Sequence, residues 1–195
     1  PFDLESVDLL VNDLGLKVLK LPSGEITNAP LILRAAQSGA SIILSTGMST
    51  IGEVETALGI LAYGFMNPSR FVQPSVNSFQ EAYVSVEGQR LLKEKVTILH
   101  CTTEYPAPFE DVNLLVIDTL KHTFQLPAGY SDHTEGIAVT IAAVARGATM
   151  VEKHFTLDRS LPGPDHQASL EPNELKQMVQ SIRQIELAIG QPLKS

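Results

Sequence analysis

The chain has 195 residues, 44% of them hydrophobic, and a formal net charge of −8 at pH 7. This length can bury one sizeable hydrophobic core, and the composition is that of a globular protein, not a disordered one. The negative charge disfavours nucleic acid and anionic membranes as partners. It still allows a small anionic substrate, because a few lysines and backbone N–H groups suffice to bind one phosphate.

Cysteine content and hydropathy indicate the cellular compartment in which we expect the protein. Cys101 is the only cysteine, so no internal disulfide can form. No apolar run approaches the roughly 18 residues that a membrane helix needs, and no secretory signal pattern opens the chain. We therefore expect a cytoplasmic protein without a membrane segment.

Strand and helix patterns alternate along the chain. Apolar runs bounded by turn residues predict strands over 16–21, 41–44, 96–101, 127–131 and 149–155. Capping residues and apolar periodicity predict helices over 3–12, 28–39, 50–63, 78–93, 111–123, 135–146 and 172–190. We interpret residues 64–80, which are rich in Pro, Asn and Ser, as a surface excursion.

This order predicts a parallel sheet with helical crossovers, as either a doubly wound open sheet or a (β/α)8 barrel. No G-x-G-x-x-G motif follows a strand, and every predicted strand is polar at its C-terminal end, where barrel enzymes carry their chemistry. We therefore expect an α/β protein with a (β/α)8 barrel. About five of the eight units are present, and about three strands are expected before Pro1. The polar residues at the strand ends are Lys20, Ser23, Glu25, Ser45, Thr46, His100, Thr102, Thr103, Glu104, Tyr105, Tyr130, Ser131, Asp132, His133, His154 and Asp165.

The predicted strand 149–155 carries ionisable residues. Alternation places Glu152 and His154 on one face and Lys153 on the other, and a proline-stiffened loop with Asp165 and His166 follows. This pattern indicates a site. A satisfied core histidine followed by a plain turn explains the same residues equally well.

Two histidines at successive strand ends, His133 and His154, suit a divalent transition ion such as Mn²⁺ or Fe²⁺. The signal is weak, because the two residues are far apart in sequence. A structural zinc site is not expected, because no set of cysteines accompanies them.

The stretch from Lys20 to Glu25 combines a cation, the Ser23 hydroxyl and backbone N–H groups ahead of a helix, which suits a phosphate or carboxylate. Lys20 could equally extend from a strand end into solvent. Glu25 fits either an ion pair with Lys20 or a general acid/base. Tyr105 can offer a hydroxyl to a ligand, whereas we interpret His100 as a strand residue and His122 as a surface residue.

The strand-end motifs read Lys20-Leu21-Pro22-Ser23-Gly24-Glu25, Leu44-Ser45-Thr46-Gly47-Met48, Leu99-His100-Cys101-Thr102-Thr103-Glu104-Tyr105-Pro106, Gly129-Tyr130-Ser131-Asp132-His133-Thr134, Val151-Glu152-Lys153-His154-Phe155-Thr156 and Pro162-Gly163-Pro164-Asp165-His166. In this order they resemble the sialic acid synthase family, which includes the N-acetylneuraminate, legionaminate and pseudaminate synthases. The resemblance covers nearly the whole chain.

The resemblance implies a transferase of the EC 2.5.1 class that forms a carbon–carbon bond. It condenses phosphoenolpyruvate with an open-chain N-acetylated amino sugar, such as N-acetylmannosamine or a bacterial analogue. The products are a nine-carbon 2-keto sugar acid and phosphate. The family requires a divalent metal, commonly Mn²⁺, with Mg²⁺ or Co²⁺ as alternatives.

The resemblance also assigns roles, residue by residue. His133 and His154 match the metal ligands, and Glu25 matches an active-site carboxylate. Thr103 stands where some members carry Asn, at a substrate-binding position. The remaining matches are to residues that hold phosphoenolpyruvate, Lys20, Ser23 and Ser131, and to residues that contact the sugar, Tyr105 and Asp165.

Family members are longer than this chain. They carry barrel strands before its first residue and a C-terminal antifreeze-like (SAF) domain that reaches a partner subunit's site, so we expect residues 1–195 to be the C-terminal part of the barrel and the full-length protein to be a homodimer. The alternative is a non-catalytic remnant that binds ligand or partner without turnover. A related phosphoenolpyruvate aldolase is a third interpretation, but it would need a second phosphate pocket, for which the sequence offers no spare basic cluster.

Overall fold

The computed structural model describes residues 1–69 and 74–193. Five strands form a sheet in the order β1-β2-β3-β4-β5, and the β1–β2 and β4–β5 pairs are parallel. A doubly wound sheet reverses its strand order at a switch point, whereas a barrel runs sequentially, so this order confirms the predicted barrel class. The strands are β1 Val18–Leu21, β2 Ser41–Ser45, β3 Val96–Cys101, β4 Ala128–Asp132 and β5 Val151–Lys153. The helices are α1 Leu4–Asp8, α2 Ala29–Gln37, α3 Ile51–Met66, α4 Val76–Val84, α5 Val86–Lys95, α6 Val116–Phe124, α7 Ala138–Ala145 and α8 Pro172–Ile189.

The chain divides into two compact units. Unit one comprises Pro1–Ile98 and Phe124–Pro127, and unit two comprises Leu99–Thr123 and Ala128–Ser195. In the described part of the chain, no helix is both long and apolar enough to cross a membrane.

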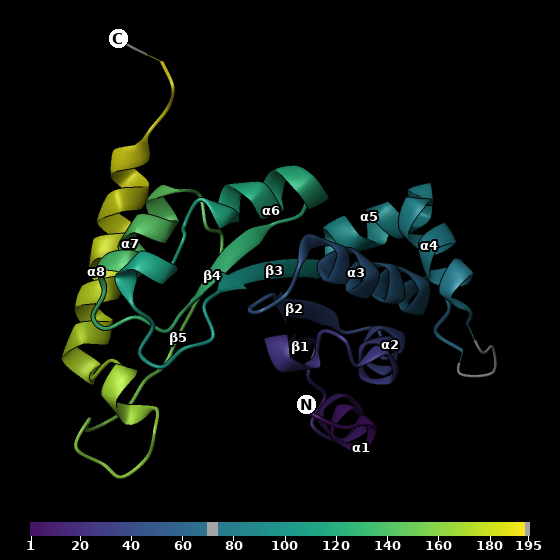
Figure 1. The fold of residues 1–195 in the computed structure, drawn as a ribbon, viewed down its shortest axis with the longest axis horizontal. Coiled ribbons are helices and arrows are strands. Elements are labelled where there is room, and N and C mark those ends of the chain that lie inside the picture. The colour runs from purple at the N-terminus through teal and green to yellow at the C-terminus, as the bar shows by residue number, and fades with distance from the viewer. Residues whose placement is uncertain (70–73, 194–195) are drawn as a thin grey trace. The chain divides into compact units, whose positions relative to one another are not determined.

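Helix α3 is the centre of unit one, where it packs against α2, α4 and α5 (Figure 1). It begins with the predicted capping box, because the Thr50 hydroxyl accepts from the Glu53 N–H at 3.2 Å and the Glu53 carboxylate accepts from the Thr50 N–H at 2.7 Å. Most of its residues from Val54 to Gly64 are buried, as expected of a helix that is apolar on nearly every side.

The segment after α3 differs from the prediction. Helix α3 continues to Met66 and α4 starts at Val76, so much of the predicted excursion 64–80 is helical, and residues 70–73 lie outside the described residues. The single helix predicted over 78–93 is broken at Ser85 into α4 and α5. Ser85 is extended, and its hydroxyl accepts from the Gly88 N–H at 2.9 Å, so it starts a new helix instead of continuing the old one.

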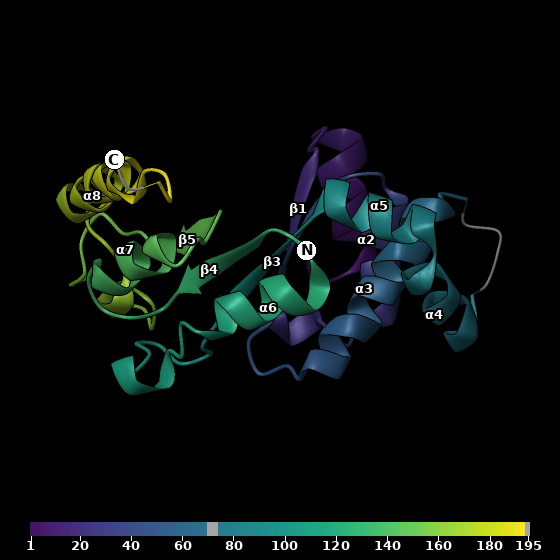
Figure 2. The ribbon, with the colours of Figure 1, turned by 90° about the horizontal axis from the view of Figure 1, so that it is seen from above.

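In unit two, α7 packs on β4, and α7 and α8 lie side by side (Figure 2). Helices α6 and α7 begin later than predicted, at Val116 instead of 111 and at Ala138 instead of 135. The reason is backbone geometry, because Asn113 and Gly136 have φ values of 49° and 73°, which a right-handed helix cannot include.

Candidate functional site

The two predicted histidines of unit two meet at the ends of neighbouring parallel strands. His133 directly follows β4, His154 directly follows β5, and the residues before them, Asp132 and Lys153, are paired in the strand register. The ring centroids of His133 and His154 are 5.5 Å apart, with the rings nearly perpendicular at 88°. The carboxyl ends of the strands thus bring together two residues that are distant in sequence.

His133 is held in one tautomer. Its Nδ1 lies 2.6 Å from the carbonyl oxygen of Thr102, and a carbonyl can only accept, so Nδ1 carries the proton. Burial lowers the pKa of His133 and so favours the neutral ring. The hydrogen bond to Thr102 has the opposite and smaller effect. In the neutral ring Nε2 keeps an unprotonated lone pair, as metal ligation requires.

A serine and a carboxylate lie beside this lone pair. The buried Ser131 hydroxyl is 3.3 Å from Nε2 of His133 and donates to Oε1 of Glu152 at 2.7 Å. Glu152 was not among the predicted site residues. The available signal was strand alternation, which places Glu152 on the face of His154 and Ser131 on the face of His133.

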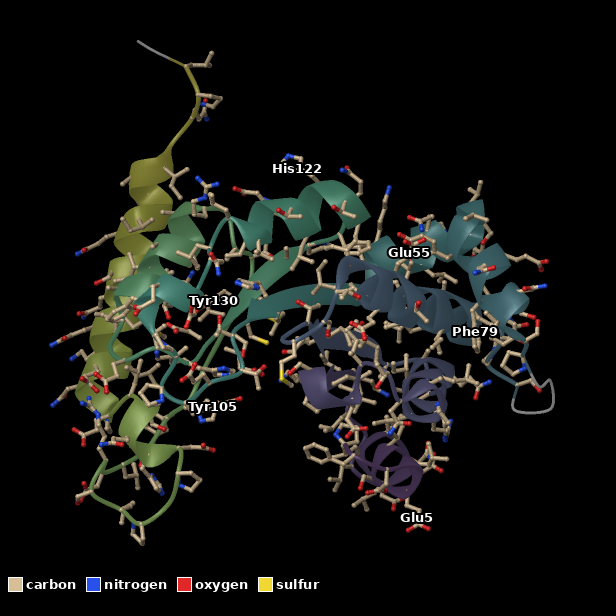
Figure 3. All side chains as sticks on the ribbon, viewed as in Figure 1. Glu5, Glu55, Phe79, Tyr105, His122 and Tyr130 are labelled. Atoms are coloured by element: carbon tan, nitrogen blue, oxygen red, sulfur yellow. The ribbon has the colours of Figure 1, made fainter. Side chains whose placement is uncertain are left out.

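Tyr105 covers the two histidines from the loop after β3, and Figure 3 shows it apart from the β4 residue Tyr130. Its ring centroid is 4.2 Å from that of His133 and 5.4 Å from that of His154, and the residue is 43% exposed. Burial raises the pKa of Tyr105, with smaller effects from the charges of Cys101, Asp165 and Glu152, so its hydroxyl stays protonated and can donate. Thr103, on the same loop, is exposed.

Asp165 approaches His154 from the loop after β5, with 3.8 Å between Oδ2 of Asp165 and Nδ1 of His154. Strand β5 is shorter than the strand predicted over 149–155, because the chain leaves the sheet after Lys153. Leu170 brings it back by donating to the His154 carbonyl oxygen at 2.9 Å, and Phe155 and Leu170 form an isolated parallel bridge. The return of the loop to His154 explains why Asp165 lies beside that ring.

Two of the three residues predicted to hold phosphoenolpyruvate, Lys20 and Ser23, belong to unit one, as does the predicted active-site carboxylate Glu25, whereas the third, Ser131, belongs to unit two. Lys20 is a half-buried residue of β1, and Ser23 and Glu25 lie in the 3-10 turn Ser23–Glu25 that follows this strand. The Glu25 carboxylate accepts from Nδ2 of Asn28 at 2.6 Å, and the side chain of Asn28 caps α2. The structure thus places Lys20, Ser23 and Glu25 at the C-terminal end of β1, as the sequence predicted, and gives Glu25 a structural bond there.

His100 and His122, which we interpreted as a strand residue and a surface residue, lie as expected. His100 is a buried residue of β3 whose Nε2 donates to the Val112 carbonyl oxygen at 2.6 Å. His122 is an exposed residue of α6 (Figure 3). Neither contributes to the cluster around His133.

The donor set of this cluster fits a divalent transition ion in part. Two neutral imidazoles suit Mn²⁺ or a similar ion, and the lone pair on Nε2 of His133 is available. Among the residues that the structure describes, no three His, Cys, Asp or Glu side chains are arranged to hold a metal. Within the described residues, His133 and His154 are thus the two imidazoles that could bind such an ion.

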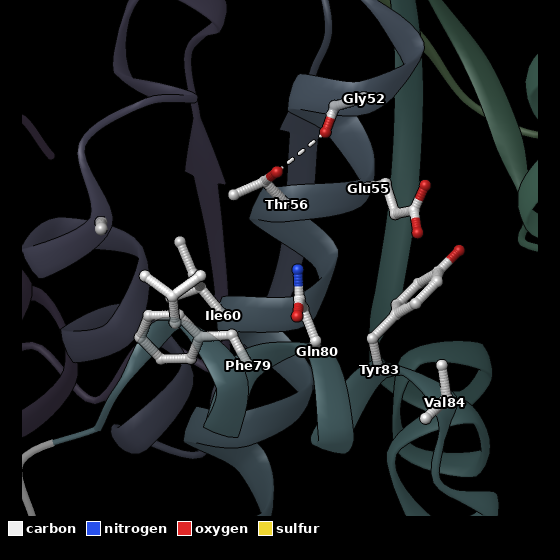
Figure 4. A pocket seen from close by; sticks show the side chains of 11 residues that line it. Gly52, Glu55, Thr56, Ile60, Phe79, Gln80, Tyr83 and Val84 are labelled. Atoms are coloured by element: carbon white, nitrogen blue, oxygen red, sulfur yellow. Dashed lines mark hydrogen bonds between the residues drawn. The ribbon is translucent and has the colours of Figure 1, made fainter.

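A separate cavity of about 600 Å³ lies among the helices of unit one (Figure 4). Its lining includes Ile60, Phe79 and Tyr83, and burial together with the charge of Glu55 raises the pKa of Tyr83. None of the predicted site residues lines this cavity, which is formed by α2, α3 and α4 and not by strand ends.

Comparisons with known proteins find relatives along nearly the whole chain. The model of the NeuB family matches residues 1–194. The chain is 50% identical over 194 residues to N,N'-diacetyllegionaminic acid synthase of Campylobacter jejuni, covering 100% of this chain and 50% of that protein. It is 35% identical over 185 residues to human N-acetylneuraminate-9-phosphate synthase, covering 94% of this chain and 44% of that protein. The chain thus spans about half the length of these curated relatives.

Solved structures give the same answer for the fold. The N-acetylneuraminic acid (sialic acid) synthetase from Leptospira borgpetersenii, in complex with citrate, superposes with a TM-score of 0.81 at 34% identity, covering 100% of this chain and 58% of that one. A phospho-2-dehydro-3-deoxyheptonate aldolase from Thermotoga maritima superposes with a TM-score of 0.70 at 16% identity, a likeness of fold alone, covering 97% and 50%. The five strands therefore form part of a (β/α)8 barrel, and the chain belongs to the NeuB family.

Proposed function

We propose that the protein condenses phosphoenolpyruvate with an open-chain N-acetylated amino sugar, giving a nine-carbon 2-keto sugar acid and phosphate. The observation that carries this proposal is the cluster at the strand ends of unit two. There, the rings of His133, His154 and Tyr105 lie close together, the Ser131–Glu152 pair lies at Nε2 of His133, and Asp165 lies near Nδ1 of His154. The names of the two curated relatives given above, synthases of N,N'-diacetyllegionaminic acid and of N-acetylneuraminate-9-phosphate, support the same reaction.

The reaction balances without an oxidant or reductant. Carbon 3 of the enolpyruvate forms a bond to the aldehyde carbon, whose oxygen takes up a proton, and positive charge develops at carbon 2. Water adds at carbon 2 and loses a proton. The bond between carbon 2 and the phosphate oxygen then breaks while the hydroxyl at carbon 2 gives its proton to the leaving phosphate, which leaves a ketone and inorganic phosphate. A divalent ion held by His133 and His154, Mn²⁺ or alternatively Mg²⁺ or Co²⁺, would supply Lewis acidity toward the aldehyde oxygen.

The residues of the chain hold and orient the reactants. The protonated Tyr105 hydroxyl and the exposed Asp165 carboxylate would bond sugar hydroxyl or amide groups. Thr103 would add a contact from the same loop as Tyr105. In unit one, Lys20 and Ser23 would balance and bond the charge of the phosphate.

The test is phosphate release by the full-length protein. It is incubated with phosphoenolpyruvate, Mn²⁺ and a panel of hexosamines that carry either one or two acetamido groups. The relative that is 50% identical makes a diacetylated product, so we expect acceptors with two acetamido groups to give the faster release. Release should stop when a chelator is added and return with Mn²⁺. Phosphoenolpyruvate binding without release for any acceptor would favour the alternative of a barrel that binds ligand without turnover.

A further inference from the structure

Behind the two histidines lies a buried ion pair that the proposed chemistry does not use. Nζ of Lys153 is 3.2 Å from Oδ2 of Asp132, and their side chains are 3% and 0% exposed. The Asp132 carboxylate also accepts from the N–H and the hydroxyl of Thr134, at 2.8 and 2.7 Å, and from the hydroxyl of Thr140 in α7. Lys153 in turn donates to the carbonyl oxygen of Thr134.

A contribution to the stability of the fold does not by itself explain why this ion pair is buried. Moving two charges out of water is costly, and apolar residues of similar volume are often as stabilising. The position of the pair in the sheet offers a more specific explanation.

Each member of the pair directly precedes one of the histidines. Asp132 and Lys153 are register partners in β4 and β5, and His133 and His154 are the next residues of the two chains, where strand pairing ends. Side chains alternate along a strand, so the pair points toward α7, where Thr140 lies, and the histidines point to the opposite face. The ladder that would normally fix the spacing of two such residues is missing beyond this point.

The hydrogen bonds of Lys153 extend across His133. Its ammonium group reaches the carboxylate of Asp132 before the histidine and the carbonyl oxygen of Thr134 after it. The Asp132 side chain before His133 and the Thr134 backbone after it are therefore both tied to the residue that precedes His154. We propose that Asp132 and Lys153 are positioning residues, which together with Thr134 set the distance and angle between the imidazoles of His133 and His154.

This inference rests on the proposed function for its purpose, a two-histidine metal site, but not for its geometry. It predicts that loss of the pair disturbs the histidines even when the fold survives. The variants are Lys153→Met and the doubly neutral Asp132→Asn/Lys153→Met, made in the full-length protein. The double variant leaves no unpaired buried charge, so it should fold even where the single variant does not.

Two readouts separate positioning from general stability. The first is the affinity for Mn²⁺ alone, measured by the free-ion electron paramagnetic resonance signal. We expect the dissociation constant to rise at least tenfold in the double variant. The second is the nuclear Overhauser contact between the rings of His133 and His154, measured in the metal-free protein. The centroids of these two rings are 5.5 Å apart. We expect this contact to weaken or disappear.

Two controls complete the design. Arg146→Gln breaks the exposed ion pair of Arg146 with Asp118 in the same unit and should leave both readouts unchanged. Leu120→Ala opens the core under α6 and should lower the melting temperature without changing the ring contact. A double variant with wild-type Mn²⁺ affinity and an unchanged ring contact would overturn the proposal. An equal loss of affinity in Leu120→Ala would also overturn it.

Failure of the proposed metal site looks different. If His133→Ala bound Mn²⁺ as tightly as the wild type, the assignment of His133 as a ligand would be wrong. The ring contact in metal-free protein would still report whether Asp132 and Lys153 hold the two histidines in place.

Discussion

Acid should destabilise the fold through His100, which anchors the loop that carries Tyr105. His100 lies in β3, and its Nε2 donates at 2.6 Å to the carbonyl oxygen of Val112, near the end of that loop. Burial lowers the pKa of His100 below its ordinary value, in spite of this hydrogen bond. The unfolded chain therefore binds more protons than the folded one between the two pKa values, so stability rises with pH in that window.

The size of the effect follows from linkage. Full stability is present above the ordinary histidine pKa of about 6.5 and is lost as pH falls below it, until the folded pKa is passed. Between pH 7.5 and 5.5, His100 can contribute a loss of about 1.4 kcal/mol at most, the equivalent of one pKa unit. Urea unfolding followed by circular dichroism at both pH values measures this loss.

The matched variants are His100→Gln, which keeps a donor for Val112 but does not titrate, and His122→Gln, which changes an exposed histidine of α6. We expect the free energy of unfolding to depend less on pH in His100→Gln and to follow the wild type in His122→Gln. An equal loss of stability with acid in the wild type and in His100→Gln would refute the reasoning.

Two further predictions concern the proposed phosphate pocket and the packing of unit two. Lys20→Met should lower kcat/KM for phosphoenolpyruvate by a factor equivalent to about 2–5 kcal/mol. The control Lys17→Met, at an exposed position, should leave kcat/KM unchanged. Unchanged KM and kcat in Lys20→Met would exclude phosphate binding by Lys20. Gly129→Ala should destabilise the protein by about 1–3 kcal/mol or more. Its new Cβ would lie 2.6 Å from Cδ2 of Leu99 and closer still to the carbonyl oxygen of Met150. The control Gly52→Ala, with no atom within 4 Å of the new Cβ, should keep or raise the melting temperature; a wild-type melting temperature for Gly129→Ala would contradict the packing.

The sequence predicted the parts of the fold that depend on local pattern and strand order. The strand 96–101 was predicted at its observed bounds, because apolar β-branched residues between a charged helix end and a polar loop leave little choice. The meeting of His133 with His154 followed from placing both at the ends of successive parallel strands. Such placement requires only the order of the elements, not the details of packing.

The features that the sequence missed depend on competition between local options or on partners across the sheet. Ser85 broke a predicted helix because its hydroxyl caps the next helix, and the apolar pattern does not encode that choice. Alternation correctly placed Lys153 on the other face of the strand from His154. That Asp132 is the ion-pair partner of Lys153 follows only from the strand register. Glu152 was likewise visible as a residue of the same face, but its bond to Ser131 required the same register.

The hydrogen bond between His133 and Thr102 affects how the proposed role of His133 as a metal ligand should be tested. His133→Ala changes two things at once, because it removes Nε2 and also removes the Nδ1 donor from the Thr102 carbonyl oxygen, 2.6 Å away. An unpaired, partly buried carbonyl costs about 1–3 kcal/mol, so lost activity in that variant could reflect a displaced loop. His133→Asn can keep an amide donor near the position of Nδ1 while removing the imidazole. We therefore expect His133→Asn to unfold within about 1 kcal/mol of the wild type and yet to lose Mn²⁺-dependent phosphate release, while His133→Ala loses both. Mn²⁺ titration and urea unfolding of the two variants decide the matter, and wild-type Mn²⁺ affinity in His133→Asn would show that His133 is not a ligand.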